Sequence, residues 1–246
     1  MFENVLRQAD VFFTWENALL WLRALGTTLS MAVIGCCLGF ILACVLVYFR
    51  SSPHRALLPL RLLLILYVEI FRRIPFLVLI FLVLFLTRAL GFRLPLYWVA
   101  CITVTISATA FIAEIVRAGY ESVHRTQWDA AEVMNFGRFR TVWLVVMPQA
   151  WTVIIPPAFS YFVMFVKETS LASQVGVYEL MQTAKYFNNI GISPFLAFGT
   201  CLALYFMVSY PLTRFGWRIE RRLRERFRRE EGAEPLVPAL RPLPGL

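Results

Sequence analysis

Charge is scarce in this sequence of 246 residues, because charged residues make up only 16% of it. A soluble domain carries about 25% charged residues and is roughly half apolar, whereas 59% of these residues are hydrophobic. The mean hydropathy is +0.67. These values exclude a water-soluble globular fold and indicate that most of the chain lies in a lipid bilayer.

Patterns for metal binding, disulfides and catalysis are missing as well. The two histidines and two aspartates do not cluster, so we expect no catalytic residues and no metal site. The odd number of cysteines, without C-x-x-C spacing, argues against a disulfide framework or a zinc site. The sequence has no G-x-x-x-x-G-K-[ST] phosphate loop, so it is not expected to hydrolyse ATP. The five cysteines all fall in apolar stretches: Cys36, Cys37, Cys44, Cys101 and Cys201.

Long uncharged stretches are the main feature of the sequence. A helix needs about 20 apolar residues to cross a bilayer. We therefore expect an all-α integral membrane protein with about five transmembrane helices. The first stretch is too long for a secretory signal, and its N-terminal flank is too acidic. Four stretches carry no charge, and a fifth is shorter and flanked by arginines: 24–49, 94–113, 142–166, 190–213 and, for the shorter one, 74–87.

The second span, which contains the shorter stretch, needs additional residues. Its 14 uncharged residues rise only about 21 Å as a helix, so we expect the helix to begin near Leu57. Glu69 then lies near the inner boundary, within reach of Arg72 and Arg73. We interpret these three residues as a charge cluster that anchors the helix or takes part in gating. Pro75 is expected to kink or restart the helix.

Cationic residues are unevenly divided between the two sides of the predicted membrane domain. Because lysine and arginine accumulate on the cytoplasmic side, the N-terminus is expected outside and the C-terminus in the cytoplasm. The net charge of +9 is thus explained by topology, and we expect no nucleic-acid partner. One side holds Arg7, Arg23, Arg88, Arg93 and Lys185, and the other holds Arg50, Arg55, Arg117, Arg125, Arg138, Arg140 and nine arginines in 214–241.

The same pattern divides the chain into four parts. Residues 1–23 are expected to form an extracytoplasmic segment, and residues 24–213 the transmembrane domain. Residues 214–231 are a charged run that predicts a cytoplasmic helix. Residues 232–246 contain four prolines and little that could be buried, so they are predicted to be a disordered tail.

A polar insert of nearly thirty residues separates the third and fourth spans, from Glu114 to Thr141. Within it, Thr126 and Asp129 form a capping-box pattern, and Asp129 would lie in the first turn, where the helix dipole favours an anion. Two alanines favour helix, and Asn135 can adopt the left-handed conformation that ends one. We therefore expect a short helix at 127–134, exposed to the cytoplasm.

This insert resembles the EAA loop of ATP-binding-cassette (ABC) importer permeases, here at 117–141. The family pattern is Glu-Ala-Ala, three residues, Gly, nine residues, Ile-x-Leu-Pro. This chain has Asp129-Ala130-Ala131, three residues, Asn135, nine residues and Val145-x-Met147-Pro148. Asn135 departs from the family glycine.

Four further motifs resemble the polar amino-acid branch of that family, which includes histidine, glutamine and glutamate permeases. All lie in register between about Gly26 and Arg224, and Arg73 stands where many relatives have a small residue. The motifs are Phe71-Arg72-Arg73-Ile74-Pro75, Ile112-Ala113-Glu114-Ile115-Val116-Arg117-Ala118-Gly119, Pro148-Gln149-Ala150 and Lys167-Glu168-Thr169-Ser170-Leu171.

The resemblance implies a type I ABC importer permease fold in the bacterial plasma (inner) membrane. It implies uptake of a polar amino acid delivered by a soluble amino-acid-binding protein, and a second permease chain, identical or similar, as partner. A separate ABC ATPase subunit would use ATP and Mg and grip the short helix, whereas this chain would bind no cofactor. The residues expected at the ATPase contact are Trp128, Asp129, Ala130, Ala131 and Asn135.

Ionisable residues inside spans are candidates for function. Lys167 and Glu168 lie near the predicted outer end of the fourth span. The Glu168 carboxylate could contact the amino group of a substrate, with Thr169 and Ser170 supplying hydroxyl groups. Alternatively, Lys167 and Glu168 could pair with each other or anchor the span at its boundary.

Two other spacings indicate contacts between or within helices. Glu114 and Arg117, three residues apart, are expected to form a structural pair rather than a binding site. Gly35 and Gly39 form a G-x-x-x-G pattern, which allows close helix approach and could form a dimer contact.

Two other functional classes stay open at this point. An ion-coupled secondary transporter of small solutes could use the charged residues in the spans but would need no ATPase. A non-transporting membrane scaffold would bind partners only. Neither class explains the exposed capped helix or the motifs in register.

Overall fold

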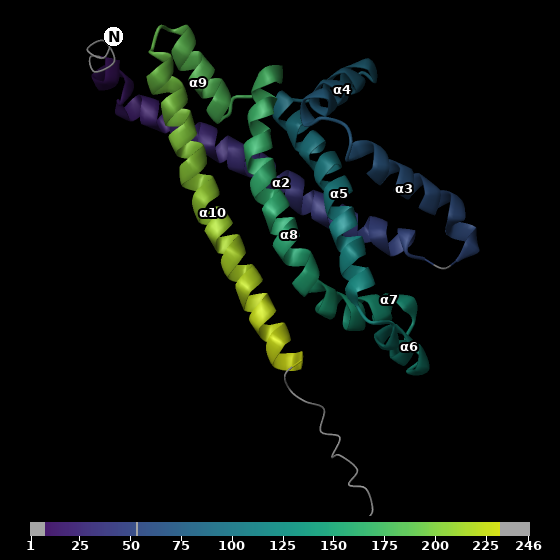
Figure 1. Cartoon of the computed structure of the whole chain (residues 1–246). Helices are drawn as coiled ribbons and strands as arrows, with labels where there is room; N and C mark the ends of the chain where they lie inside the picture. The colour runs from purple at the N-terminus through teal and green to yellow at the C-terminus, as the bar shows by residue number, and fades with distance from the viewer. Residues whose placement is uncertain (1–7, 53, 232–246) are drawn as a thin grey trace, which may run out of the picture.

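The computed structural model describes residues 8–52 and 54–231, and this part of the chain is helical (Figure 1). Four of its helices are long and apolar enough to cross a membrane, and a bent pair makes a fifth span if counted as one. The prediction of an all-helical protein with about five spans is confirmed. The four are α2 (Trp15–Arg50), α5 (Leu96–Ser122), the helical run Arg138–Val175 and the Pro194–Leu223 part of α10 (Pro194–Glu231).

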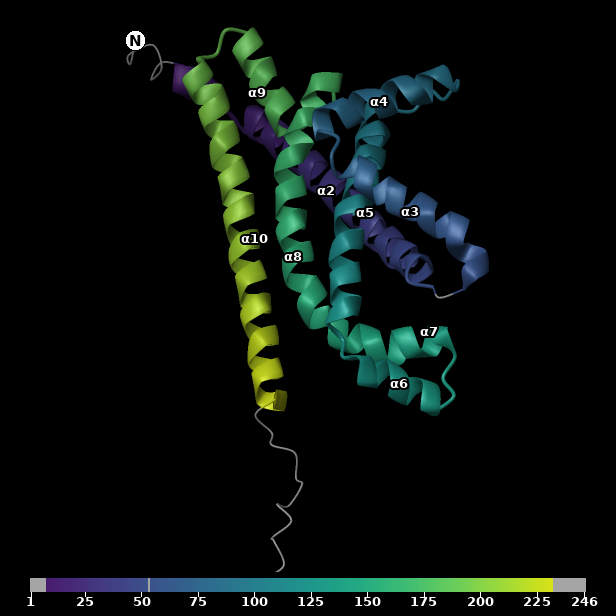
Figure 2. The ribbon, with the colours of Figure 1, turned by 45° about the vertical axis from the view of Figure 1, so that its right-hand side comes forward.

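Helix α2 begins well before the uncharged stretch that predicted it. Thr14 is its N-cap, and the Thr14 hydroxyl accepts a hydrogen bond from the Asn17 backbone N–H at 3.4 Å. The helix runs obliquely across α5 and α8 (Met147–Glu168) (Figures 1 and 2). Hydroxyl capping and tertiary packing thus extend the helix beyond the apolar residues that span the bilayer.

The two glycines of α2 pack against α5 of the same chain. A Cβ atom at Gly35 would overlap the Val104 side chain, and one at Gly39 would lie 2.7 Å from Ala108 Cβ. The G-x-x-x-G pattern therefore allows close approach within the chain, and the suggestion that it forms a dimer contact is wrong.

The second span is broken into two helices. A short 3₁₀ turn, Arg55–Leu57, leads into α3 (Leu58–Phe71), and α4 (Phe76–Ala89) follows at a bend of 118°. Pro75 is the N-cap of α4, with φ −58° and ψ 137°. The predicted restart at Pro75 is confirmed, and its cause is that proline cannot donate the hydrogen bond that would continue α3.

The fourth span is a composite of helix types. The three-residue α7 (Arg138–Arg140) continues into a π-helix, Thr141–Val146, then α8, and finally a 3₁₀ helix, Thr169–Val175. The helical run therefore extends nine residues beyond the predicted end at Val166. Lys167 and Glu168 consequently lie within this run and not at its outer end.

The connection to the last span contains a helix that the sequence analysis did not predict. This helix, α9 (Leu180–Asn189), ends in a turn in which Gly191 has φ +93°, and α10 then begins at Pro194. The charged run 214–231 forms the last part of α10 without a break. The expectation of a disordered tail at 232–246 lies outside the described residues.

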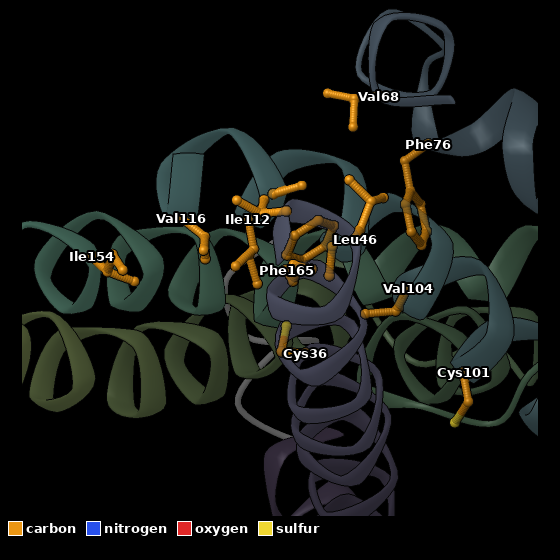
Figure 3. Close-up of a cluster of buried hydrophobic side chains, with 14 of the residues drawn as sticks. Cys36, Leu46, Val68, Phe76, Cys101, Val104, Ile112, Val116, Ile154 and Phe165 are labelled. Atoms are coloured by element: carbon orange, nitrogen blue, oxygen red, sulfur yellow. The ribbon is translucent and has the colours of Figure 1, made fainter. Parts of the chain in front are cut away.

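The core is centred on α5, which contacts α2, α3, α4 and α8. Leu46 of α2, Val104 and Ile112 of α5 and Phe165 of α8 gather in this cluster (Figure 3). A second cluster fixes α9 to the start of the chain. Its largest members are Phe12, Trp21, Leu180 and Phe187.

Candidate functional site

The short helix of the polar insert, α6 (Arg125–Val133), projects with α7 at the end of the bundle where α10 also ends (Figure 2). We call this end the α6 end. The N-cap is His124, whose Nδ1 accepts a hydrogen bond from the Thr126 N–H at 3.4 Å. The helix starts two residues earlier than predicted. The Thr126–Asp129 capping box and the placement of Asp129 in the first turn are therefore wrong.

The end of α6 follows the prediction from Asn135. This residue has φ +56°. Its N–H donates to the Glu132 carbonyl at 2.8 Å, and the Phe136 N–H donates to the Ala131 carbonyl at 3.0 Å. These two bonds form a Schellman motif, which satisfies carbonyls that the helix leaves open.

One face of α6 rests on the transmembrane helices. Ala131 is 2% exposed, and the half-buried Trp128 ring lies 6.4 Å from the Tyr120 ring, between centroids. The Gln149 side chain of α8 donates a hydrogen bond to Gln127 Oε1 at 3.4 Å. Helix α6 is thus attached to both α5 and α8.

The opposite face of α6 is open. Asp129, Ala130 and Asn135 are exposed. Val133 is 88% exposed and Met134 is 66% exposed. Two large apolar side chains beside an exposed carboxylate form a surface suited to a protein partner. The sequence analysis missed Val133 and Met134, although their position after the two alanines follows from helical periodicity.

Glu114 joins three helices near the α6 end. Its carboxylate lies 3.3 Å from Arg50 Nη1 of α2 and 3.9 Å from Arg72 Nη1 at the end of α3. Arg117 Nε, one turn further along α5, donates to it at 2.7 Å. The predicted Glu114–Arg117 pair is confirmed. The ion pair between Glu114 and Arg50 could not be predicted from the local sequence.

Glu69 forms a separate pair with Arg73 on the exposed face of α3. Arg72 was expected to share this partner, but its guanidinium reaches Glu114 instead. Arg72, the C-cap of α3, keeps the helical conformation, and its guanidinium lies over the Phe111 ring of α5, beside Glu114.

The residues of the Lys167–Ser170 segment differ in burial: Lys167 is exposed, Thr169 is buried, and Ser170 is half-buried. Glu168 is half-buried, and the described residues form no ion pair with Lys167 or Glu168. The Thr169 hydroxyl is buried and donates to the Val166 carbonyl at 2.8 Å. The suggested internal Lys167–Glu168 pair does not form, since adjacent helical residues do not face each other. Lys167 lines a hollow of about 370 Å³ with residues of α10: Leu202, Tyr205, Phe206, Ser209, Tyr210 and Thr213.

A buried carboxyl group that the sequence analysis missed lies at the start of α9. Glu179 is fully buried, and its carboxylate accepts hydrogen bonds from the Gln182 N–H and the Tyr205 hydroxyl, both at 2.8 Å. The Leu180 N–H donates to the Thr28 hydroxyl at 3.3 Å. Burial raises the pKa of the Glu179 carboxyl above its ordinary value, although these hydrogen bonds and the charge of Lys185 lower it.

The signal for this site was present in the sequence. Glutamate is not among the residue types that favour an N-cap, so this signal lies only in the apolar residues that follow. Leu180, Ala184 and Phe187 then follow the i, i+4, i+7 spacing of one helical face, and all three are buried.

Comparison with known proteins finds a matching family and several similar proteins. Residues 35–225 match the family described as binding-protein-dependent transport system inner membrane component. The chain is 32% identical over 197 residues to the L-cystine transport system permease protein TcyB of Bacillus subtilis, covering 80% of this chain and 83% of that protein. It is 30% identical over 222 residues to the probable glutamine ABC transporter permease protein GlnP of the same organism, covering 89% and 97%.

Two solved structures share the fold. An amino acid ABC transporter crystallised with histidines gives a TM-score of 0.75 at 23% identity, covering 84% of this chain and 95% of that chain. The inward-facing MetNI methionine ABC transporter gives 0.73 at 24% identity, covering 86% and 99%. The expected type I ABC importer permease fold is confirmed.

Proposed function

Because the chain belongs to the family of inner membrane components of binding-protein-dependent transport systems, we propose that it is the permease of an ATP-driven importer for a polar amino acid. Such a system includes a soluble binding protein and an ATPase, so this chain is not the catalytic subunit. Membership excludes the secondary transporter and the non-transporting scaffold. The amino-acid cargo is supported by the names of TcyB and GlnP, which refer to cystine and glutamine.

In this proposal the ATPase binds the open face of α6. The exposed Asp129 and Ala130, the left-handed Asn135 and the apolar Val133 and Met134 form the contact surface. The partner ATPase uses ATP and Mg, and its closure moves α6.

That movement reaches the spans through the inner face of α6. Trp128 contacts Tyr120 of α5, and Gln127 accepts a hydrogen bond from Gln149 of α8. Ala131 is buried at the same face, so it supports the contact from within and does not touch the ATPase.

The α6 end is the cytoplasmic end in this proposal, and the N-terminus lies outside. The excess of arginine among the segments that share the α6 end supports this orientation, because cationic residues accumulate on the cytoplasmic side. Helix α6 and the end of α10 lie at the same end of the molecule, opposite the N-terminal end of α2 (Figures 1 and 2). An ATPase in the cytoplasm can therefore reach α6.

The amino-acid path runs beside the Lys167–Ser170 segment. Glu168 is a half-buried carboxylate within a span and has no ion-pair partner among the described residues, and a carboxylate in such a place is a functional candidate. We propose that the Glu168 carboxylate binds the amino group of the substrate. The hollow beside Lys167 lies on the surface of a single chain, so a second permease chain, identical or similar, is proposed to enclose the path.

The coupling role is tested by purifying the tagged chain from its native membranes and identifying bound partners by mass spectrometry. The variants are Asp129→Arg and, as a matched control, Asp10→Arg, which makes the same charge change at an exposed site near the opposite end. A phosphate-loop ATPase should be retained by the wild type and by Asp10→Arg but lost from Asp129→Arg. Equal retention by all three chains would reject α6 as the contact.

A further inference from the structure

A cavity of about 620 Å³ lies where the ends of α2, α3 and α5 meet the start of α6. Arginines on its wall outnumber acidic residues by two, so its charge is positive. The charged lining residues are Arg50, Arg61, Arg117, Arg125, Glu121 and Asp129.

Two of the four arginines have no acidic partner. Arg50 and Arg117 are both paired with Glu114, and Arg117 also pairs with Glu121. Among the side chains that the structure describes, by contrast, no carboxylate lies within ion-pair distance of Arg61 or Arg125. The cavity therefore presents two free guanidinium groups from two different helices, α3 and α6.

Guanidinium groups bind phosphate by paired, charge-assisted hydrogen bonds. The cavity also lies at the ends of α2 and α5, two helices long and apolar enough to cross a membrane. Basic pockets between membrane helices on the cytoplasmic side are known to bind anionic headgroups. We propose that this cavity binds the phosphate group of an anionic phospholipid.

An adjoining apolar hollow favours a phospholipid over free phosphate. Tyr120 lines both the basic cavity and a hollow of about 290 Å³ that is walled by aromatic and aliphatic side chains. An acyl chain can bury its apolar surface in such a hollow, whereas inorganic phosphate has no apolar surface to bury. The hollow is formed chiefly by Phe40, Val45, Tyr48, Trp143 and Trp151.

A phosphate bound here connects α3 with α6. Arg125 is the first residue of α6, and Arg61 lies in the first turn of α3. One phosphodiester between them accepts hydrogen bonds from both guanidinium groups, offsets one of their two positive charges, and ties the start of α6 to the broken second span.

The test is native mass spectrometry of the full chain in detergent, titrated with dioleoylphosphatidylglycerol or dioleoylphosphatidylcholine. Each arginine near a membrane surface is worth about fivefold in binding an anionic lipid. The double variant Arg61→Gln/Arg125→Gln should therefore bind phosphatidylglycerol roughly twenty-five-fold more weakly than the wild type. The control Arg88→Gln/Arg93→Gln removes two exposed arginines away from the cavity and should bind like the wild type.

Further measurements identify the ligand and control for misfolding of the variants. The variant Arg61→Lys/Arg125→Lys keeps both charges and should retain most of the binding. Equal affinity for the two lipids, or unchanged phosphatidylglycerol binding by the Gln double variant, would overturn the proposal. Displacement of phosphatidylglycerol by millimolar inorganic phosphate would assign the cavity to free phosphate and overturn the lipid assignment.

Discussion

The hydroxyl of Tyr205 donates a hydrogen bond of 2.8 Å to the carboxylate of Glu179. Tyr205 belongs to α10, whereas Glu179 caps α9 and also accepts the Gln182 N–H. One buried acceptor thus holds the start of α9 against the last span. Few other hydrogen bonds connect α9 to the rest of the structure, and one of them is the 3.0 Å bond from Lys185 Nζ to the Ser173 hydroxyl.

Removing the hydroxyl should therefore loosen α9. The Tyr205→Phe change leaves a buried acceptor without its donor, which costs about 1 to 3 kcal/mol. Thermal unfolding of the purified chain in detergent measures this loss. Tyr186→Phe, at an exposed tyrosine of α9, is the control and should leave the midpoint unchanged. A midpoint for Tyr205→Phe equal to that of the control would refute the role of this bond.

The raised pKa of Glu179 also predicts a pH dependence. A native carboxyl with a raised pKa binds its proton more tightly than the unfolded chain does. Its stabilising contribution is full below the ordinary pKa of about 4.3 and is lost as the pH rises through the native pKa. Glu179→Gln cannot titrate, so its stability relative to the wild type should improve from pH 4.5 to pH 8. Melting curves of both chains across this range check the trend, and a constant difference would contradict it.

The Glu114 cluster should matter more than the Glu69 pair. Glu114→Gln leaves the arginines of three helices without their common anion, and its side chain is only 23% exposed. We expect a loss of about 1 to 3 kcal/mol. Glu69→Gln is the same change at an exposed pair and should have little effect. Chemical unfolding of the two variants decides the order, and equal losses would disprove the distinction.

Gly119 should not tolerate a side chain. A Cβ atom there would overlap Ile154 of α8, so Gly119→Ala should cost about 1 to 3 kcal/mol. Shortening the neighbour in Gly119→Ala/Ile154→Ala should make the double variant more stable than the sum of the single losses predicts. Gly199→Ala, where nothing lies within 4 Å, is the control. Strict additivity in thermal unfolding would argue against this contact.

Substrate recognition by Glu168 predicts a change in uptake affinity. Glu168→Gln removes the negative charge while keeping the shape of the side chain. The concentration for half-maximal uptake by the assembled transporter should rise about tenfold or more, because a hydrogen bond to a charged group is lost. Glu16→Gln, exposed at the start of α2, should leave it unchanged. Unaltered affinity in Glu168→Gln would remove this residue from the substrate path.

Features with a local chemical cause could be predicted from the sequence. The restart at Pro75 follows from a missing N–H group, and the end of α6 follows from the tolerance of Asn135 for positive φ. The spans themselves follow from apolar stretches, although α2 and the fourth span extend beyond them.

Features that depend on contacts between distant segments could not be predicted. Arg50 and Glu114 are 64 residues apart, and nothing near either residue indicates the other. The spacing of Gly35 and Gly39 indicates a close helix contact, but it does not indicate whether the partner helix belongs to the same chain. The start of α6 was misplaced because capping rules favour Thr126, whereas the ring of His124 supplies the acceptor.

The last carbonyls of α3 are hydrogen-bonded within their own segment of the chain. Hydrocarbon offers no hydrogen-bond donor, so a helix that stops within a span must satisfy its last carbonyls by other means. The carbonyls of Val68 and Ile70 accept from the N–H groups of Arg72 and Arg73 at 3.2 and 3.0 Å, and the Glu69 carbonyl accepts from Arg73 Nε at 3.1 Å. Arg73 thus takes the place of water at this helix end. A leucine there would make the span more hydrophobic and yet less suited to the bilayer, because it would uncover a peptide oxygen.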